Sequence, residues 1–132
     1  MKFYLAGRFK QKDLIKKYYL ILESYGHTIT SKWTEQDCIK LFRENKSKAQ
    51  QYILEDFSGI KNADIFILFA EYEPDARGCY IELGYALSNA ENSNLKIFVV
   101  SKDDNPSMFF MDKKVELVNT FDQVLNKLKE EF

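Results

Sequence analysis

The chain has 132 residues, of which 45% are hydrophobic, 15% are aromatic and 30% are charged, and its net charge is -1. This length and apolar content predict a single domain over residues 1–132 with its own core. The lack of a basic excess argues against binding to a nucleic acid polymer, whereas a phosphate on a small ligand needs only one or two local cations.

The first predicted element is a strand over residues 2–6, with Gly7, Arg8 and Phe9 at its carboxyl end. A glycine at this place permits a tight turn and the close approach of a ligand, although the GxGxxG dinucleotide fingerprint is absent. Arg8 fits two roles, phosphate binding or an ion pair with an acidic neighbour. A helix is expected over residues 12–25. Its apolar stripe is Leu14, Tyr18, Ile21 and Tyr25, with Ile15 and Leu22 beside it.

A modest strand over residues 27–31 leads to Trp33, the one tryptophan of the chain. Trp33 fits two roles, stacking on a base or capping the core. The polar residues 35–46 are interpreted as a mobile segment with a short helical turn, a candidate lid. The next helix, residues 47–62, carries Asp56 beside its apolar stripe, where a carboxylate requires a hydrogen-bond partner or a catalytic role. The stripe itself is Ala49, Ile53, Phe57 and Ile60.

The most hydrophobic run, residues 64–70, predicts a strand buried on both faces of a parallel sheet. A polar loop, residues 71–78, connects it to a helix whose first turn is expected to carry Glu82. Ligands of open α/β sheets bind at the carboxyl ends of the strands, so Glu82 is aimed at the ligand. A carboxylate that only complements the helix dipole would occupy the same place, and the dipole is expected to keep it ionised. Gly84, costly inside a helix, predicts a close approach of helix and strand.

The remaining elements are a strand over residues 95–100, a short apolar run at 107–111, a strand over 115–118 and a helix that Thr120 caps. The apolar run is too short for a helix of its own and is a candidate interface if it is exposed. The alternation of strands and helices predicts a three-layer α/β fold, in which helices cover both faces of a five-stranded, mainly parallel sheet.

The cysteines and the histidine of the chain do not form a binding motif. Cys38 and Cys79 lack metal or redox spacing, and His27 has no partner at the spacing of metal ligands. No segment resembles a secretory signal or approaches the length of a transmembrane helix. We therefore expect a cytoplasmic protein in a reducing compartment, with no membrane partner, no metal and no cofactor. Cys79 is interpreted as a packing residue.

Three segments together resemble the nucleoside 2-deoxyribosyltransferase superfamily, which also contains nucleoside 5′-monophosphate N-glycosidases. They are Tyr4-Leu-Ala-Gly7, Asp56 with Gly59-Ile60 and Ala63-Asp64, and Ile81-Glu-Leu-Gly-Tyr-Ala-Leu87. The resemblance spans nearly the whole chain. It implies a flavodoxin-like or Rossmann-like sheet in the order 2-1-3-4-5 and oligomers built on dimers. It also implies a glutamate nucleophile, which matches Glu82, and a helix aspartate, which matches Asp56. The second acid of the transferases would fall at Ala76, and Asp75 lies one residue earlier.

The implied reaction is cleavage of the N-glycosidic bond of a nucleoside or a nucleoside 5′-monophosphate, with transfer of the sugar to another base or to water. Glu82 would attack the sugar and form a covalent intermediate, while Asp56 or Asp75 would protonate or orient the leaving base. The implied partners are this small-molecule substrate and further copies of the chain, as a homodimer or higher oligomer. The alternative is a non-catalytic nucleotide-binding sensor or adaptor with the same fold.

The residues expected to bind the substrate come from the loops at the carboxyl ends of the first three strands and the start of the Glu82 helix. They are Tyr4, Gly7, Arg8, Phe9, Trp33, Tyr72, Arg77 and Gly78. Two of them, Arg8 and Arg77, suit a phosphate by charge-assisted hydrogen bonds, unless they pair with the acidic residues of the 71–78 loop. The aromatic rings of Phe9, Trp33 and Tyr72 suit stacking on a base.

Overall fold

A parallel five-stranded sheet forms the middle of the molecule in the computed structural model, which describes residues 1–71, 77–102 and 107–130. The strands are β1 (Lys2–Ala6), β2 (Thr28–Ile29), β3 (Ile65–Phe69), β4 (Lys96–Val100) and β5 (Val115–Val118). Their order is β2-β1-β3-β4-β5, and every neighbouring pair is parallel. The predicted fold class and strand order are therefore confirmed.

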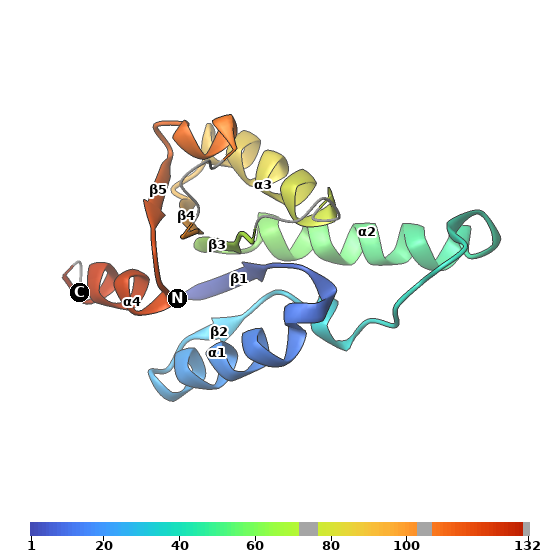
Figure 1. Ribbon diagram of the computed structural model, residues 1–132, viewed down its shortest axis with the longest axis horizontal. Coiled ribbons are helices and arrows are strands. Elements are labelled where there is room, and N and C mark those ends of the chain that lie inside the picture. The colour runs from blue at the N-terminus through green and yellow to red at the C-terminus, as the bar shows by residue number, and fades with distance from the viewer. Residues whose placement is uncertain (72–76, 103–106, 131–132) are drawn as a thin grey trace.

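Helices cover both faces of this sheet (Figure 1). They are α1 (Lys12–Ser24), α2 (Lys46–Lys61), α3 (Arg77–Ala90) and α4 (Phe121–Glu130). Tyr18 of α1 stacks on Phe121 of α4 with ring centroids 4.2 Å apart, so these two helices share one face. Phe57 of α2 stacks on Tyr85 of α3 at the same distance on the other face. Short 3-10 turns occur at Phe9–Gln11, Trp33–Glu35, Phe42–Glu44 and Met108–Met111.

The core is built around β1 and β3, the two strands next to one another in the middle of the sheet. All five residues of β3 are buried, and so is β1 from Phe3 to Ala6. This pattern follows from parallel strands covered on both sides, which have no solvent face and need no polar alternation. The carboxyl ends of β1 and β3 are consequently held by the buried centre of the sheet.

The buried face of α1 differs from the predicted one. Leu14, Ile21 and Tyr25 are 43%, 38% and 58% exposed, so the predicted stripe is largely on the surface. The residues that enter the core are Ile15, Tyr19 and Leu22. The helix carries two overlapping apolar stripes. The one that packs on the sheet includes Ile15 and Leu22, which the sequence analysis placed beside the main stripe.

The amino-terminal half of α2 projects beyond the sheet, as Figure 1 shows. The helix has 16 residues and is about 24 Å long, whereas a strand of five residues spans about 16 Å. The overhang lies at the carboxyl ends of the strands, because α2 runs antiparallel to the strand that follows it. Ile53, predicted to be buried, is therefore 50% exposed, and only the last turns of the predicted stripe reach the core.

The close approach of a helix to the sheet occurs at a different glycine from the predicted one. A Cβ atom on Gly59 would lie 2.6 Å from the carbonyl oxygen of Thr30 and 3.0 Å from the ring of Tyr4, so α2 approaches the sheet backbone closely there. A Cβ on Gly84 would meet no atom within 4 Å. The close approach predicted at Gly84 is wrong, since this position faces outward, and the close approach lies at Gly59 instead.

No helix in the three described stretches is long and apolar enough to cross a membrane.

Candidate active site

A cleft of about 690 Å³ opens at the carboxyl ends of β1 and β3. Its walls are the loop after β1, the segment from Trp33 to Phe42, the projecting half of α2 and the start of α3. The cleft brings together the predicted site residues Gly7, Arg8, Phe9, Trp33, Asp56, Gly78 and Glu82. The topology predicted from the alternation of elements therefore leads to one shared site, because carboxyl ends of neighbouring parallel strands meet at one edge.

Glu82 lies on the floor of the cleft, where the hydroxyl of Tyr4 donates a short hydrogen bond to its Oε2. Tyr4 is a fully buried β1 residue, so its ring and hydroxyl are fixed by the core. Burial raises the pKa of Tyr4 far above its ordinary value, and the phenol is therefore a permanent donor. Predicted as a substrate-binding residue, Tyr4 reaches the cleft through the Glu82 carboxyl that it holds.

The protonation state of Glu82 differs from the expected one. Burial raises the pKa of Glu82 to about 8, the neighbouring Asp56 adds to this rise, and the Tyr4 hydrogen bond opposes it. The first turn of α3 contains no acidic residue, because the helix starts at Arg77 and Glu82 lies in its second turn. The dipole effect is confined to the first turn. The expectation that the dipole keeps Glu82 ionised is therefore wrong, and removal from solvent decides its charge.

Asp56 approaches the same cleft from α2. Its Oδ1 accepts a hydrogen bond of 3.0 Å from the Nε2 of Gln36, which also donates to Glu55 Oε2 at 3.1 Å. Burial raises the pKa of Asp56 to about 6; the Gln36 amide opposes that rise, and the Glu55 charge adds to it. The partner that the sequence analysis required for this carboxylate is thus Gln36. Two carboxyls with raised and different pKa values in one cleft are typical of acid–base chemistry.

The loop after β1 is shaped by Gln11, which the sequence analysis did not single out. Gln11 Oε1 accepts from the backbone N–H of Arg8 at 2.8 Å, and its Nε2 donates to Glu71 at 3.3 Å. A Cβ on Gly7 would lie 2.6 Å from the end of the Ile15 side chain and 3.0 Å from Gln11 Oε1, so a larger residue here would have to displace these two side chains. Polar glutamine in a loop gives no sequence signal, because its role depends on packing.

Trp33 and Phe9 present aromatic surface to the cleft in different ways. Trp33 is 6% exposed, and its indole N–H donates to the Leu5 carbonyl at 2.7 Å, so it caps the core and offers only a small part of its ring to the cleft. Phe9 is 36% exposed, with the Lys12 ammonium 4.8 Å from its ring centroid. Phe9 therefore has the more accessible face for stacking on a ligand.

The cysteine thiols of the chain both line this cleft. Cys79 is buried beside Glu82, and its pKa rises to about 11 through burial and the Glu82 charge. A thiol with so high a pKa is a poor nucleophile, in agreement with a packing role. Within residues 1–71, 77–102 and 107–130, no group of three His, Cys, Asp or Glu side chains could hold a metal ion.

Two predicted site residues, Tyr72 and Asp75, lie outside the described residues. Arg77 begins α3, and its side chain is outside the described part as well. Their roles remain predictions.

Comparison with known proteins adds a family and a fold to this geometry. The family model described as nucleoside 2-deoxyribosyltransferase matches residues 3–128. A search of curated proteins finds no match.

Two solved structures share the fold across nearly their whole length. A 2-deoxyribosyltransferase from Bacillus psychrosaccharolyticus superposes with a TM-score of 0.74 at 22% identity, over 96% of this chain and 91% of that one. The CMP N-glycosidase BcmB from Clostridium botulinum superposes with a TM-score of 0.64 at 21% identity, over 98% and 99%.

Proposed function

The chain belongs to the nucleoside 2-deoxyribosyltransferase family, and from this premise and the geometry of the cleft we propose that it cleaves N-glycosidic bonds of small nucleosides or nucleotides. The observation that carries the proposal is the pair of carboxyls in one cleft, Glu82 on its floor and Asp56 on its α2 wall, with Glu82 held by the Tyr4 hydroxyl. The two structural relatives are a 2-deoxyribosyltransferase and a CMP N-glycosidase, so the proposal includes both another base and water as acceptors of the sugar.

In the proposed first step, an ionised Glu82 oxygen attacks C1′ of the sugar. A bond forms between Glu82 and C1′, and the electron pair of the C1′–N bond leaves with the base nitrogen. Protonated Asp56 gives its proton to the leaving base, or Asp75 does so. In the second step, a base nitrogen or a water attacks C1′ and Glu82 leaves as a carboxylate, while the proton of the attacking group returns to Asp56. This two-step route is that of retaining glycosidases.

The remaining cleft residues suit the rest of such a substrate. Gly7 lines the cleft where the sugar would lie, and the exposed ring of Phe9 can stack on the base. Arg8 lines the cleft, and together with Arg77 it would bind a 5′-phosphate. A 5′-monophosphate is accordingly the favoured form of the substrate.

We also propose that the protein forms a homodimer or higher oligomer through the outer face of α3. Ile81 of α3 is 64% exposed, and Met108 and Phe109 of the neighbouring 3-10 turn are 75% and 61% exposed. With Gly84 and Phe110, Ile81 and Phe109 line an apolar hollow of about 370 Å³. Exposed apolar patches of this kind mark interaction surfaces.

The test is incubation with a panel of nucleosides, 2′-deoxynucleosides and their 5′-monophosphates, with the free base measured by chromatography. We expect base release from at least one member, and a covalent sugar adduct on Glu82 by mass spectrometry. Asp56→Asn should slow turnover by about 10²–10⁴-fold, the usual scale of general acid catalysis, without preventing the adduct with an activated leaving group. Ligand binding without release of any base would favour the sensor, and equal rates for nucleosides and monophosphates would refute the phosphate preference.

A further inference from the structure

Gln36 connects the wall of the cleft to its acid. The residue follows the 3-10 turn Trp33–Glu35, and its side chain crosses to α2. One amide nitrogen donates to two carboxylates of consecutive α2 residues, to Glu55 Oε2 at 3.1 Å and to Asp56 Oδ1 at 3.0 Å. A primary amide has two N–H groups, so this arrangement uses the complete donor capacity of the Gln36 nitrogen.

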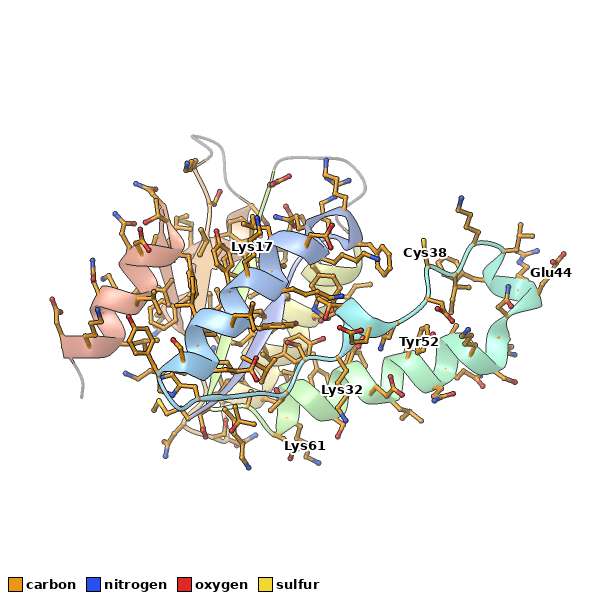
Figure 2. All side chains as sticks on the ribbon, turned by 90° about the horizontal axis from the view of Figure 1, so that it is seen from below. Lys17, Lys32, Cys38, Glu44, Tyr52 and Lys61 are labelled. Carbon is orange, nitrogen blue, oxygen red and sulfur yellow. The ribbon has the colours of Figure 1, made fainter. Side chains whose placement is uncertain are left out.

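The residue after Gln36 fixes the same segment to the same face of α2. The backbone N–H of Asp37 donates to the Tyr52 hydroxyl at 3.0 Å, and its carboxylate lies 2.5 Å from the Lys48 ammonium. Lys48, Tyr52 and Asp56 are spaced four residues apart and therefore share one face of the helix. Figure 2 shows Cys38 and Tyr52 in the region where this segment runs beside the projecting half of α2. The segment that lines the cleft is thus docked on α2 beside Asp56.

We propose that Gln36 is a positioning residue, which orients Asp56 and determines which of the two cleft carboxyls holds the proton in the resting protein. This inference rests on the proposed function for its catalytic meaning, but not for its effect on the proton. Among the described residues, the ionisable groups that interact with Asp56 are Glu55 on its own helix, Glu82 from α3 and Tyr4 from β1. Gln36 is the neutral donor among the neighbours that contact Asp56 from the described segments, and a donor stabilises a carboxylate.

In the resting state that follows, the proton lies on the nucleophile Glu82, whereas the proposed reaction needs it on Asp56. With Gln36 on Asp56, the pKa of Asp56 stays at about 6, below the value of about 8 at Glu82, so Glu82 holds the proton at neutral pH. The proposed reaction needs the reverse arrangement. When the Gln36 amide turns from Asp56 to the leaving base, Asp56 loses a donor, so its pKa rises while that of Glu82 falls, and the two carboxyls come to compete for the proton. The O–H bond on Glu82 then breaks and an O–H bond forms on Asp56, with no other change.

The test is to follow the carboxyl titrations of both residues in the ligand-free protein by NMR of isotope-labelled side chains. Gln36→Met keeps the length of the side chain and removes its donors. We expect the apparent pKa of Asp56 to rise by about one unit, the usual effect of one hydrogen bond to a charged group. The apparent pKa of Glu82 should fall at the same time, because a neutral Asp56 no longer repels its charge. Two opposite shifts distinguish proton placement from a structural role.

Gln51 provides the matched control, since its amide donates to the other oxygen of Glu55 at 3.3 Å and has no bond to Asp56. Gln51→Met should leave both titrations unchanged. Gln36→Asn is a second variant, because its shorter side chain cannot bridge the two carboxylates and should reproduce the shifts. Circular dichroism checks that each variant folds.

The outcomes separate this inference from the proposed function. Wild-type titrations of Asp56 and Glu82 in folded Gln36→Met and Gln36→Asn would overturn it, whether or not the enzyme cleaves nucleosides. Opposite shifts in a protein that releases no base would support the placement of the proton by Gln36 and refute the proposed reaction. Opposite shifts together with a displaced pH optimum of kcat/KM in Gln36→Met would support both.

Discussion

Replacing Glu82 with Gln should abolish activity and increase the stability of the fold at alkaline pH. The amide has nearly the same size as the carboxyl, and its oxygen can still accept the hydrogen bond from Tyr4. Turnover should be abolished, because an amide cannot form the covalent link to the sugar. The fold should persist and become more stable than that of the wild type at alkaline pH, because the variant has no charge to bury there.

The size of this effect follows from the pKa of Glu82, which is about 8 in the folded protein against an ordinary value of 4.5. A raised pKa means that the folded state holds the proton more tightly than the unfolded chain. The resulting stability is fully present below about pH 4.5 and is lost as the pH rises through about 8. The shift of about 3.5 units corresponds to at most about 5 kcal/mol, an upper bound because Glu82 keeps some access to the cleft. Gln does not titrate, so this decline is absent from the variant.

The measurement is the free energy of unfolding in urea at several pH values from about 5 to about 9, for the wild type and Glu82→Gln. We expect the two curves to diverge from about pH 5 to about pH 8 and to stay apart above it, with the variant more stable by a few kcal/mol. Glu91→Gln, an exposed carboxylate just beyond α3, is the control and should parallel the wild type. Parallel curves for Glu82→Gln as well would show that burial does not govern the Glu82 charge. Wild-type turnover in this variant would refute the nucleophile assignment.

Three further predictions follow from single contacts. Tyr4→Phe removes the donor to Glu82 and should raise the pKa of Glu82 further, so ionised Glu82 together with protonated Asp56 becomes rarer. At neutral pH kcat/KM should fall about tenfold, and the alkaline limb of its pH profile should move to higher pH. Gly59→Ala should lower the free energy of unfolding by about 1–3 kcal/mol, because its Cβ would strike the sheet backbone. Gly84→Ala should raise the free energy of unfolding by up to about 1 kcal/mol, because this helix position faces open space. Ile81→Asp should reduce the mass seen by light scattering to that of a monomer, and a wild type that is itself monomeric at high micromolar concentration would refute the oligomer.

The sheet was predictable because its central strands leave a strong local signal. The run at Ile65–Phe69 is apolar without alternation, and a parallel strand covered on both faces requires such a run. The faces of the helices were less predictable, because α1 offers two apolar stripes and α2 extends beyond the sheet that would bury it. Periodicity shows that a helix has an apolar side. Which residues of that side are buried depends on the length and position of the elements packed against the helix.

The sequence was sufficient to predict which acidic residues form the site, but not their protonation states. Glu82 stands out in the sequence because it lies at the start of a helix after a buried strand, and Asp56 because it lies beside the apolar stripe of its helix. Their pKa values depend on how many protein atoms surround them, and this is a property of the folded packing. Gln11 and Gln36 carried no signal at all. Both are glutamines in polar stretches, and only the fold brings their amides to Arg8 and to Asp56.

A nucleophile that holds a proton at rest is compatible with catalysis, since the energetic cost is small. With a pKa of about 8, roughly a tenth of Glu82 is ionised at neutral pH, so forming the reactive carboxylate costs about 1.4 kcal/mol. Transfer of the same proton to Asp56 keeps the total charge of the cleft constant and supplies the acid that the leaving base needs. The protein therefore need not exchange a proton with solvent when the substrate closes the cleft. The proton that stabilises buried Glu82 at low pH is thus the same proton that Asp56 gives to the leaving base. Gln36 controls its position between the two carboxyls.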